Sequence, residues 1–105
     1  MAITVTALTA EGFTNNTQTQ DTAYSLTPVA GRRYVAIALQ SRGATLSGSS
    51  AVVTHLGGTA LTLTAITGFE TISQNGSNTA GGKLVAFEGL AGGSETAGAI
   101  RSDSG

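Results

Sequence analysis

Short runs in which apolar and polar residues alternate dominate this chain. In residues 2–8, Ile3 and Val5 lie on one side of such a run and threonines on the other, whereas residues 33–41 are apolar at almost every position. A period of two is typical of β-strands. A strand that is apolar on both faces is expected at the centre of a sheet, covered on both sides. We therefore predict an N-terminal strand at 2–8 and a central strand at 33–41.

The rest of the chain repeats this pattern between turn signals. β-branched residues and glycines are scattered throughout and disfavour helix, and Gly57-Gly58 and Asn75-Gly76 are turn sequences. Further strands are expected at 24–27, 52–56, 59–66, 69–73, 83–88 and 96–101, the 59–66 strand directing Leu61, Leu63 and Ala65 inward. Seven or eight short strands predict an all-β fold, a compact antiparallel β-sandwich or barrel.

One β domain is expected to span residues 1–105, with an N-terminal strand and arm at 1–21, a sandwich core at 22–101 and a soft tail at 102–105. Residues 13–20 are rich in Thr, Asn and Gln. They are either an exposed edge strand or part of a flexible polar arm, residues 11–21, that orders on binding.

The composition predicts a thin core. Thr, Ala, Gly and Ser make up 58 of the 105 residues, and only 26 residues are apolar and larger than alanine. Ordering each residue costs about 1.5 kcal/mol, against about 25 cal/mol for each Å² of apolar surface buried. We infer that a partner surface, another copy of the chain in the first place, supplies part of the burial.

Charge and targeting signals limit the classes of partner that this chain is expected to bind. Five basic and six acidic residues give a net charge of −1, and the basic residues form no stripe, which argues against nucleic acid. No stretch approaches a membrane span, and the N-terminus has no secretory pattern. The absence of cysteine excludes disulfides and thiolate metal sites. We expect no metal, no cofactor and assembly in a cytoplasm.

Few residues of this chain are candidates for catalysis. His55 is the single imidazole, and catalysis would require a nucleophile and an orienting acid beside it. We expect His55 to be structural or solvent-facing, with a small hydrolase as a remote alternative. The six carboxylates are interpreted as solvated turn and edge charges, because no calcium-loop pattern or aromatic sugar platform accompanies them.

Two short stretches resemble proteins of tailed-phage virions. Gly82-Lys83-Leu84-Val85-Ala86-Phe87-Glu88-Gly89, followed by Ala97-Gly98-Ala99-Ile100, resembles the head decoration (cement) proteins of lambda-like phages. Thr27-Pro28-Val29-Ala30-Gly31-Arg32, with Gly58-Thr59-Ala60-Leu61-Thr62-Leu63-Thr64, is similar to β-modules of phage tail and head-fibre proteins. Lambda-like decoration proteins continue past the Gly-Ile strand, whereas this sequence ends at Gly105. If the first resemblance holds, we expect a shorter C-terminal end or a different sheet.

The decoration resemblance implies a homotrimer on the capsid surface, with an N-terminal segment that orders against the shell. Its partners would be further copies of the chain and the major capsid protein or other virion subunits, and its location the virion. The alternative is a fibre module that binds a receptor or carbohydrate, for which Phe13 and Phe69 are the candidate aromatics. The candidate subunit contacts are Ile3, Val5, Phe13, Tyr24, Tyr34 and Phe87, of which the last three are also candidates for core anchors.

Overall fold

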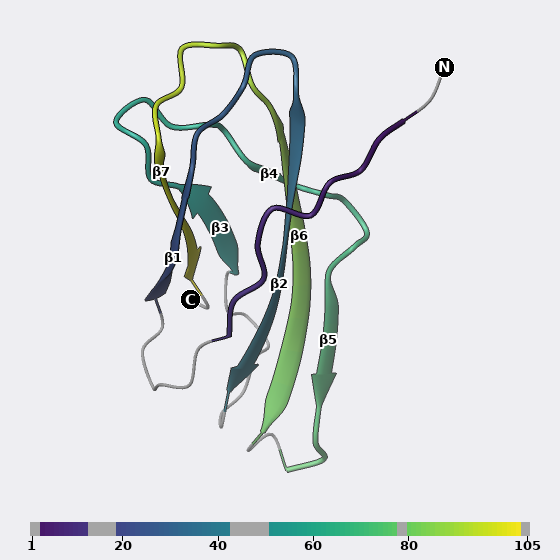
Figure 1. The fold of residues 1–105 in the computed structure, drawn as a ribbon. Coiled ribbons are helices and arrows are strands. Elements are labelled where there is room, and N and C mark those ends of the chain that lie inside the picture. Colours follow the sequence, from purple (N-terminus) through teal and green to yellow (C-terminus); the bar gives the residue numbers. More distant parts are fainter. Residues whose placement is uncertain (1–2, 13–18, 43–50, 78–79, 104–105) are drawn as a thin grey trace.

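The chain folds into two antiparallel β-sheets packed face to face. The computed structural model describes residues 3–12, 19–42, 51–77 and 80–103, and these contain strands and loops without a helix. The strands are β1 (Thr19–Leu26), β2 (Arg33–Arg42), β3 (Val52–His55), β4 (Thr64–Ala65), β5 (Thr71–Gln74), β6 (Gly81–Leu90) and β7 (Gly98–Asp103). One sheet has the order β1-β7-β3 and the other β2-β6-β4, with β5 also paired to β6 (Figure 1). The predicted all-β sandwich is confirmed.

The pairing of β2 with β6 organises the larger sheet. Its register runs without a shift from Arg33 opposite Leu90 to Arg42 opposite Gly81. Directly opposed residues in an antiparallel pair lie on the same face of the sheet. The alternation in both strands therefore separates an inner face, which includes Phe87, from an outer face, which includes Ile37.

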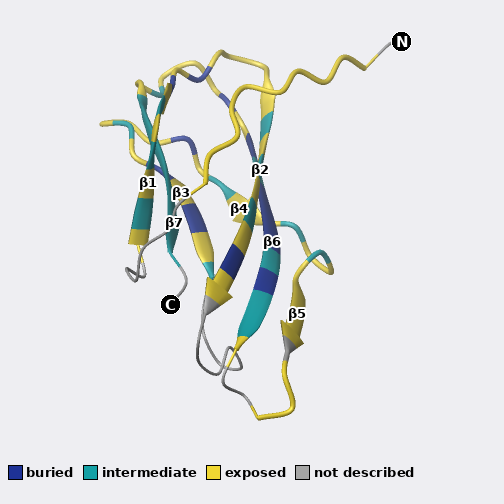
Figure 2. Ribbon diagram, turned by 60° about the horizontal axis from the view of Figure 1, so that its bottom comes forward, coloured by how far each residue is buried: buried dark blue, intermediate teal, exposed yellow. Residues whose placement is uncertain are grey.

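Two small apolar clusters form the core between the sheets. Leu26, Leu61 and Ala91 make the first, and Val53, Val85 and Phe87 make the second. Leu63 and Ile100, both half-buried, pack against both clusters and so join them. The buried positions in Figure 2 form short blue segments rather than whole strands, as expected for a chain with few large apolar residues.

Close approach of two loops closes one end of the sandwich. Thr59 N–H donates to Thr96 Oγ1 over 3.0 Å, and Thr96 N–H donates to the Thr59 carbonyl over 2.9 Å. A Cβ added at Gly57 would overlap the carbonyl oxygen of Thr96, and one added at Gly98 would overlap the main chain of Gly57. Only glycine allows these two segments to lie so close.

Two predicted strands are wrong. Residues 3–12 form no strand, although 2–8 has the alternating pattern. The predicted 59–66 strand is too long: Thr64 and Ala65 form β4 and Ile66 N–H donates to the Ala86 carbonyl, while Ala65 is exposed rather than inward. The physical reason for the second is that main-chain groups of Thr59 and Leu61 bond to Thr96 and His55 instead of to a neighbouring strand.

The expected central position of 33–41 is also wrong. This segment is β2, which lies at the end of its sheet and pairs with β6 alone among the described residues. Val35, Ile37 and Leu39 on its outer face are 57 %, 64 % and 75 % exposed. Apolar residues on both faces therefore reflect one face in the core and a second face that the described chain leaves uncovered.

The ends of the strands differ from expectation as well. Thr19, Gln20 and Asp21, predicted as part of the polar arm 11–21, belong to β1. Ser102 and Asp103, predicted as part of the tail 102–105, belong to β7. These two strands pair with each other from Thr19 opposite Asp103 onward, so each ordered segment is extended by the other. Residues 13–18, including Phe13, lie outside the described residues.

Leu61→Ala is expected to lower the free energy of unfolding by about 2–5 kcal/mol, because a fully buried leucine is lost from the core. Leu39→Ala removes the same atoms from a side chain that is 75 % exposed and should change the free energy by less than about 0.5 kcal/mol. Urea denaturation of dilute protein followed by circular dichroism measures both. Equal losses would contradict the exposed position of Leu39 on the outer face of β2.

Candidate interaction surface

A long apolar groove opens between the two edge strands β1 and β2. It has a volume of about 1580 Å³, and Val53, Leu63 and Ile100 of the core contribute to its lining. Residues on both faces of β2 line it as well, so the groove extends around the free edge of that strand. We call this space the edge groove. The sandwich is therefore open along the side where its two outermost strands face each other.

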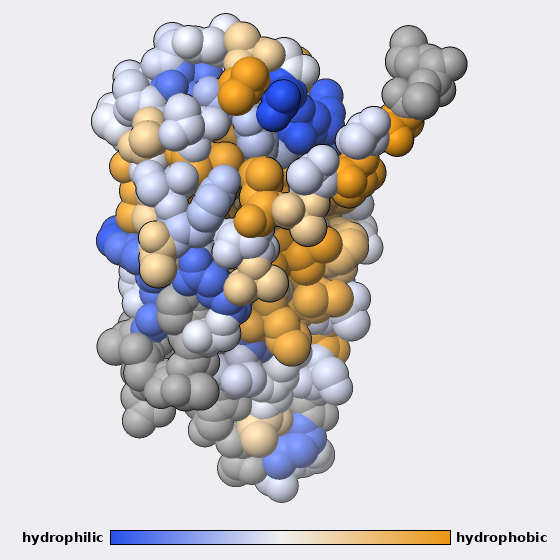
Figure 3. All heavy atoms as spheres, viewed as in Figure 1, coloured by the Kyte–Doolittle hydropathy of each residue, from blue (hydrophilic) through white to orange (hydrophobic). Residues whose placement is uncertain are grey.

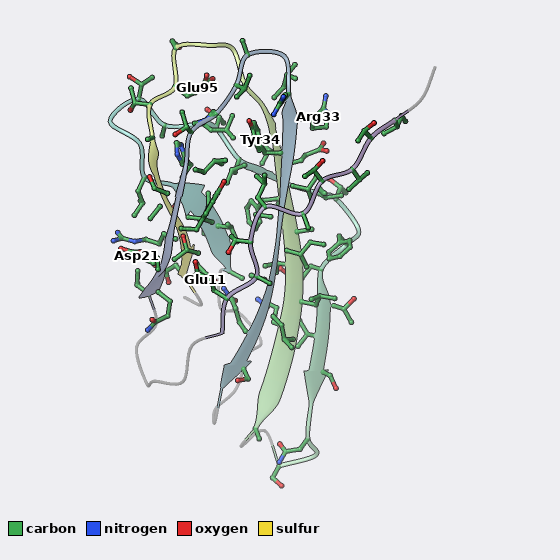
Figure 4. The ribbon with its side chains drawn as sticks, viewed as in Figure 1. Glu11, Asp21, Arg33, Tyr34 and Glu95 are labelled. Atoms are coloured by element: carbon green, nitrogen blue, oxygen red, sulfur yellow. The ribbon has the colours of Figure 1, made fainter. Side chains whose placement is uncertain are left out.

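Residues 3–12 also line this groove, and from here on we call this segment the N-terminal arm. Its anchor is Glu11, whose two carboxylate oxygens accept hydrogen bonds from Ala23 N–H and Tyr24 N–H, both over 2.9 Å. Figure 4 shows Glu11 between β1 and β2. Farther along the arm, Ile3 and Val5 are 88 % and 90 % exposed. The arm is thus tied to the fold at one end only.

Glu11 occupies a place where β1 departs from regular pairing. The register between β1 and β7 shifts between Asp21 and Ser25. Within this irregular segment, Thr22 Oγ1 donates to the Tyr24 carbonyl over 2.9 Å and accepts from Ile100 N–H over 3.0 Å. With the Glu11 carboxylate on the outer side, β1 has side-chain partners for main-chain groups that a regular ladder would have satisfied.

The outer face of β2 forms an apolar surface that we call the outer patch, defined by Val35, Ile37 and Leu39. In Figure 3 apolar atoms gather on this side of the molecule, over β2 and β6. At one end of the patch, Arg33 and Glu88 form an exposed ion pair with 3.7 Å between Nη1 and Oε2. Contiguous exposed apolar surface with a polar rim is typical of a protein-binding site.

Polar side chains close the opposite end of the interior. Gln40, 8 % exposed, donates from Nε2 to Ser102 Oγ and to the Asp103 carbonyl, which links β2 to β7. Its Oε1 has no hydrogen-bond partner among the described residues. Lys83, 2 % exposed, lies 3.8 Å from a carboxylate oxygen of Glu70. Gln40 and Lys83 face each other across the β2–β6 pair.

His55 is a structural residue in this geometry. Its ring is 3 % exposed, and Nδ1 accepts from Leu61 N–H over 2.9 Å. Nε2, which must then carry the proton, lies 3.2 Å from the Leu26 carbonyl and donates to it. Both ring nitrogens are therefore engaged by buried main-chain groups, and among the described residues neither nitrogen bonds to a serine or a carboxylate.

Two carboxylates stabilise strand and loop ends. Asp21 pairs with Arg101 at 2.6 and 2.8 Å across β1 and β7; the hydrogen bond from the guanidinium lowers the pKa of Asp21, and the same pair raises the pKa of Arg101. Glu95 accepts from Gly92 N–H and Gly93 N–H, both over 2.8 Å. These main-chain donors lower the pKa of Glu95.

The predicted contact residues fall into different places. Ile3 and Val5 project from the arm, whereas Phe87 is buried with Val53 and Val85. Tyr24 and Tyr34 are half-buried against the Leu26 cluster, and the Tyr34 hydroxyl accepts from Val29 N–H over 2.9 Å. The structure gives these three aromatic residues core positions. Phe13 lies outside the described residues.

Sequence reasoning missed the outer patch and the anchor Glu11. The signal for the patch was present, because residues 34–41 contain no charge and are apolar on both faces, but it was interpreted as full burial. Glu11 carried no signal, since its partners are main-chain groups 12 and 13 positions away.

Other kinds of site find less support. The large exposed apolar residues of the described chain are all aliphatic, and Phe69 is half-buried, so a stacking platform for sugars is not formed by these residues. No three His, Cys, Asp or Glu side chains of the described residues cluster as metal ligands would. Within the same residues, no helical segment has the length and hydropathy needed to cross a membrane.

Comparison with protein-family models, with curated proteins and with solved structures gave no match to this chain.

His55→Ala is expected to destabilise the fold by about 2–5 kcal/mol, because Leu61 N–H and the Leu26 carbonyl would lose their partners inside the core. Thr54→Ala, at an exposed neighbouring position on β3, is the matched control and should change stability by less than about 0.5 kcal/mol. Thermal and urea unfolding measure the difference. An unchanged melting curve for His55→Ala would show that the ring is dispensable.

Asp21 is expected to make stability fall in acid. Its pKa in the folded chain lies below the ordinary value of 3.8, so the unfolded chain takes up the proton first as the pH drops. The contribution is complete above that ordinary value and is lost as the pH falls through the lowered folded-state pKa. Asp21→Asn should therefore show a shallower loss of stability below pH 3.8 in urea titrations. An identical acid profile would contradict the pairing with Arg101.

Proposed function

We propose that this chain is a non-enzymatic structural subunit of a virus particle, which binds other protein subunits and stabilises the assembly. The observation that carries the proposal is the outer patch beside an open sandwich edge. The most specific form of the proposal is a decoration protein that binds the head of a tailed phage.

The exposed apolar area on β2 is the physical argument for a protein partner. Val35, Ile37 and Leu39 expose more than half of their surface while the core contains few buried side chains of that size. Covering apolar surface contributes about 25 cal/mol for each Å² removed from water. A partner that covers these three side chains would add apolar burial that folding alone does not provide.

The resemblance to head decoration proteins adds the virus setting. Its two stretches coincide with β6 and with the start of β7, which lie in the middle of their sheets. The resemblance therefore concerns the scaffold and leaves the contact surface to be identified by experiment. On a capsid lattice, many weak contacts act together, because each bound site raises the effective concentration at the next.

The proposed partners are further copies of this chain, with a trimer favoured, and the major capsid protein or other virion subunits. Assembly would take place in the host cytoplasm and the finished protein would reside in the virion. No feature of the described residues favours the fibre module with a sugar ligand or the hydrolase, since exposed aromatics are absent from them and His55 is engaged by the main chain.

Ile37→Lys is expected to weaken binding to capsid shells about tenfold or more, because a charge would have to be desolvated in the middle of the docked patch. Co-sedimentation with expanded, decoration-free shells of lambda-like phages measures saturable binding. The matched control is Thr54→Lys, an exposed position on the other sheet, which should bind as the unmodified chain does. Absence of binding by the unmodified chain, or equal binding by Ile37→Lys, would contradict this role for the outer patch.

A further inference from the structure

The two edge strands on the open side of the sandwich differ in whether their free edges are protected against pairing with another strand. On β1, the Glu11 carboxylate accepts from the N–H groups of Ala23 and Tyr24. On β2, the free edge has no strand beside it among the described residues, and its middle, residues 34–41, carries no charge. Charges, prolines and bulges are the usual means of protecting such an edge, which otherwise pairs with any available strand.

The N-terminal arm has the sequence pattern of a β-strand but pairs with no strand among the described residues. Its alternating sequence places Ile3, Val5 and Ala7 on one side and Thr4 and Thr6 on the other. Residues 3–10 form no hydrogen bond with another described residue. The arm crosses the edge of β2 and then leaves the body of the molecule (Figures 1 and 2). The arm lies against the groove beside its own β2 but makes no strand pairing with it.

Arm and groove match in shape and polarity. On the groove side of β2, the inward residues are the small Ala36 and Ala38, next to the space lined by Val53, Leu63 and Ile100. The groove has a volume of about 1580 Å³ and its lining already includes Ile3 and Val5 of the chain's own arm, so the arm of a second copy would take the place of side chains of the same size. At about 3.3 Å per residue, eight arm residues extend about 26 Å, within the length of the ten-residue β2. No charge from either segment would be buried.

We propose that the arm of one copy adds as a strand to the free edge of β2 in a second copy, with Ile3 and Val5 directed into the edge groove. This inference rests on the proposed function as an assembling subunit and names the segment and edge through which copies associate. A cyclic exchange, in which each arm adds to the β2 edge of the next copy, satisfies every arm and every edge in one closed ring, and three copies would make the favoured trimer. The outer patch also borders the edge groove, but it lies on the other face of β2, where an added strand would place Thr4 and Thr6 beside it and leave its outward surface for the shell.

Cysteine cross-linking tests the exchange, and the natural absence of cysteine makes each added thiol unique. Val5→Cys in one preparation is mixed with Ala38→Cys, or with Ala36→Cys, in a second preparation of distinguishable mass, under mild oxidation. A disulfide requires Cα atoms within about 7 Å. We expect heterodimers to form readily with at least one of the two positions. Thr4→Cys, one residue away and on the other side of the arm, is the matched control and should give several-fold fewer heterodimers.

Light scattering gives a second measurement that does not depend on the thiols. A variant lacking residues 2–8 keeps Glu11 and loses only exposed residues of the described chain, so it should melt as the full chain does at concentrations where the full chain is monomeric. We expect the full chain to associate in a concentration-dependent way and the shortened variant to remain monomeric. Association of the shortened variant at unchanged strength would overturn the proposal.

Two further outcomes would overturn it. The chain that carries Val5→Cys and Ala38→Cys together could close within a monomer at high dilution, which would show that the arm fills its own groove. Alternatively, Thr4→Cys could link as well as Val5→Cys. In either case, binding to capsid shells and its sensitivity to Ile37→Lys remain separate measurements, so failure of the exchange leaves the proposed function standing, and failure on the shells leaves the exchange standing.

Discussion

The unbroken pairing of β2 with β6 is the constraint on which the rest of the structure depends. It holds ten opposed positions in one register and so decides which apolar side chains enter the core. Val85 and Phe87 face inward against Val53 from the other sheet, while Val35 and Ile37 on β2 face outward. A register shift of one residue would turn the inward side chains of a strand outward and its outward side chains inward. Such a shift is unfavourable because the core would lose apolar side chains.

The same pairing creates the exposed surface. β6 sits in the middle of its sheet and has partners on both sides, whereas β2 has a partner on one side only. A strand that is apolar on both faces and placed at an edge leaves one face and one edge uncovered. The open edge follows from the position of β2 in the strand order, whereas the exposed patch arises because no described segment covers the outer face of β2.

Hydrogen bonds from polar side chains to main-chain groups stabilise the fold in addition to its thin core. His55 joins the Leu26 carbonyl to Leu61 N–H across the interior, and Gln40 joins β2 to the end of β7. Glu11 and Glu95 each hold two main-chain N–H groups with one carboxylate. These contacts suit a chain in which bulky apolar residues are scarce, because each satisfies main-chain groups that would otherwise be left unpaired.

The sequence by itself determined the class of fold and the approximate place of most strands, because alternation with a period of two is a local property that the strand geometry requires. It also predicted that His55 is structural or solvent-facing, and the buried ring with its two main-chain partners fits the first of these; that copies or partners complete the burial stays a prediction. It did not determine which strand lies at an edge, since the alternation in residues 33–41 is the same for a covered and an uncovered strand. Tertiary structure alone decided that β2 is uncovered, that Glu11 caps β1, and that residues 3–12 leave the sheet despite their pattern. Each of these depends on main-chain partners far away in the chain, and hydrogen bonds between distant segments leave no periodic trace in the sequence.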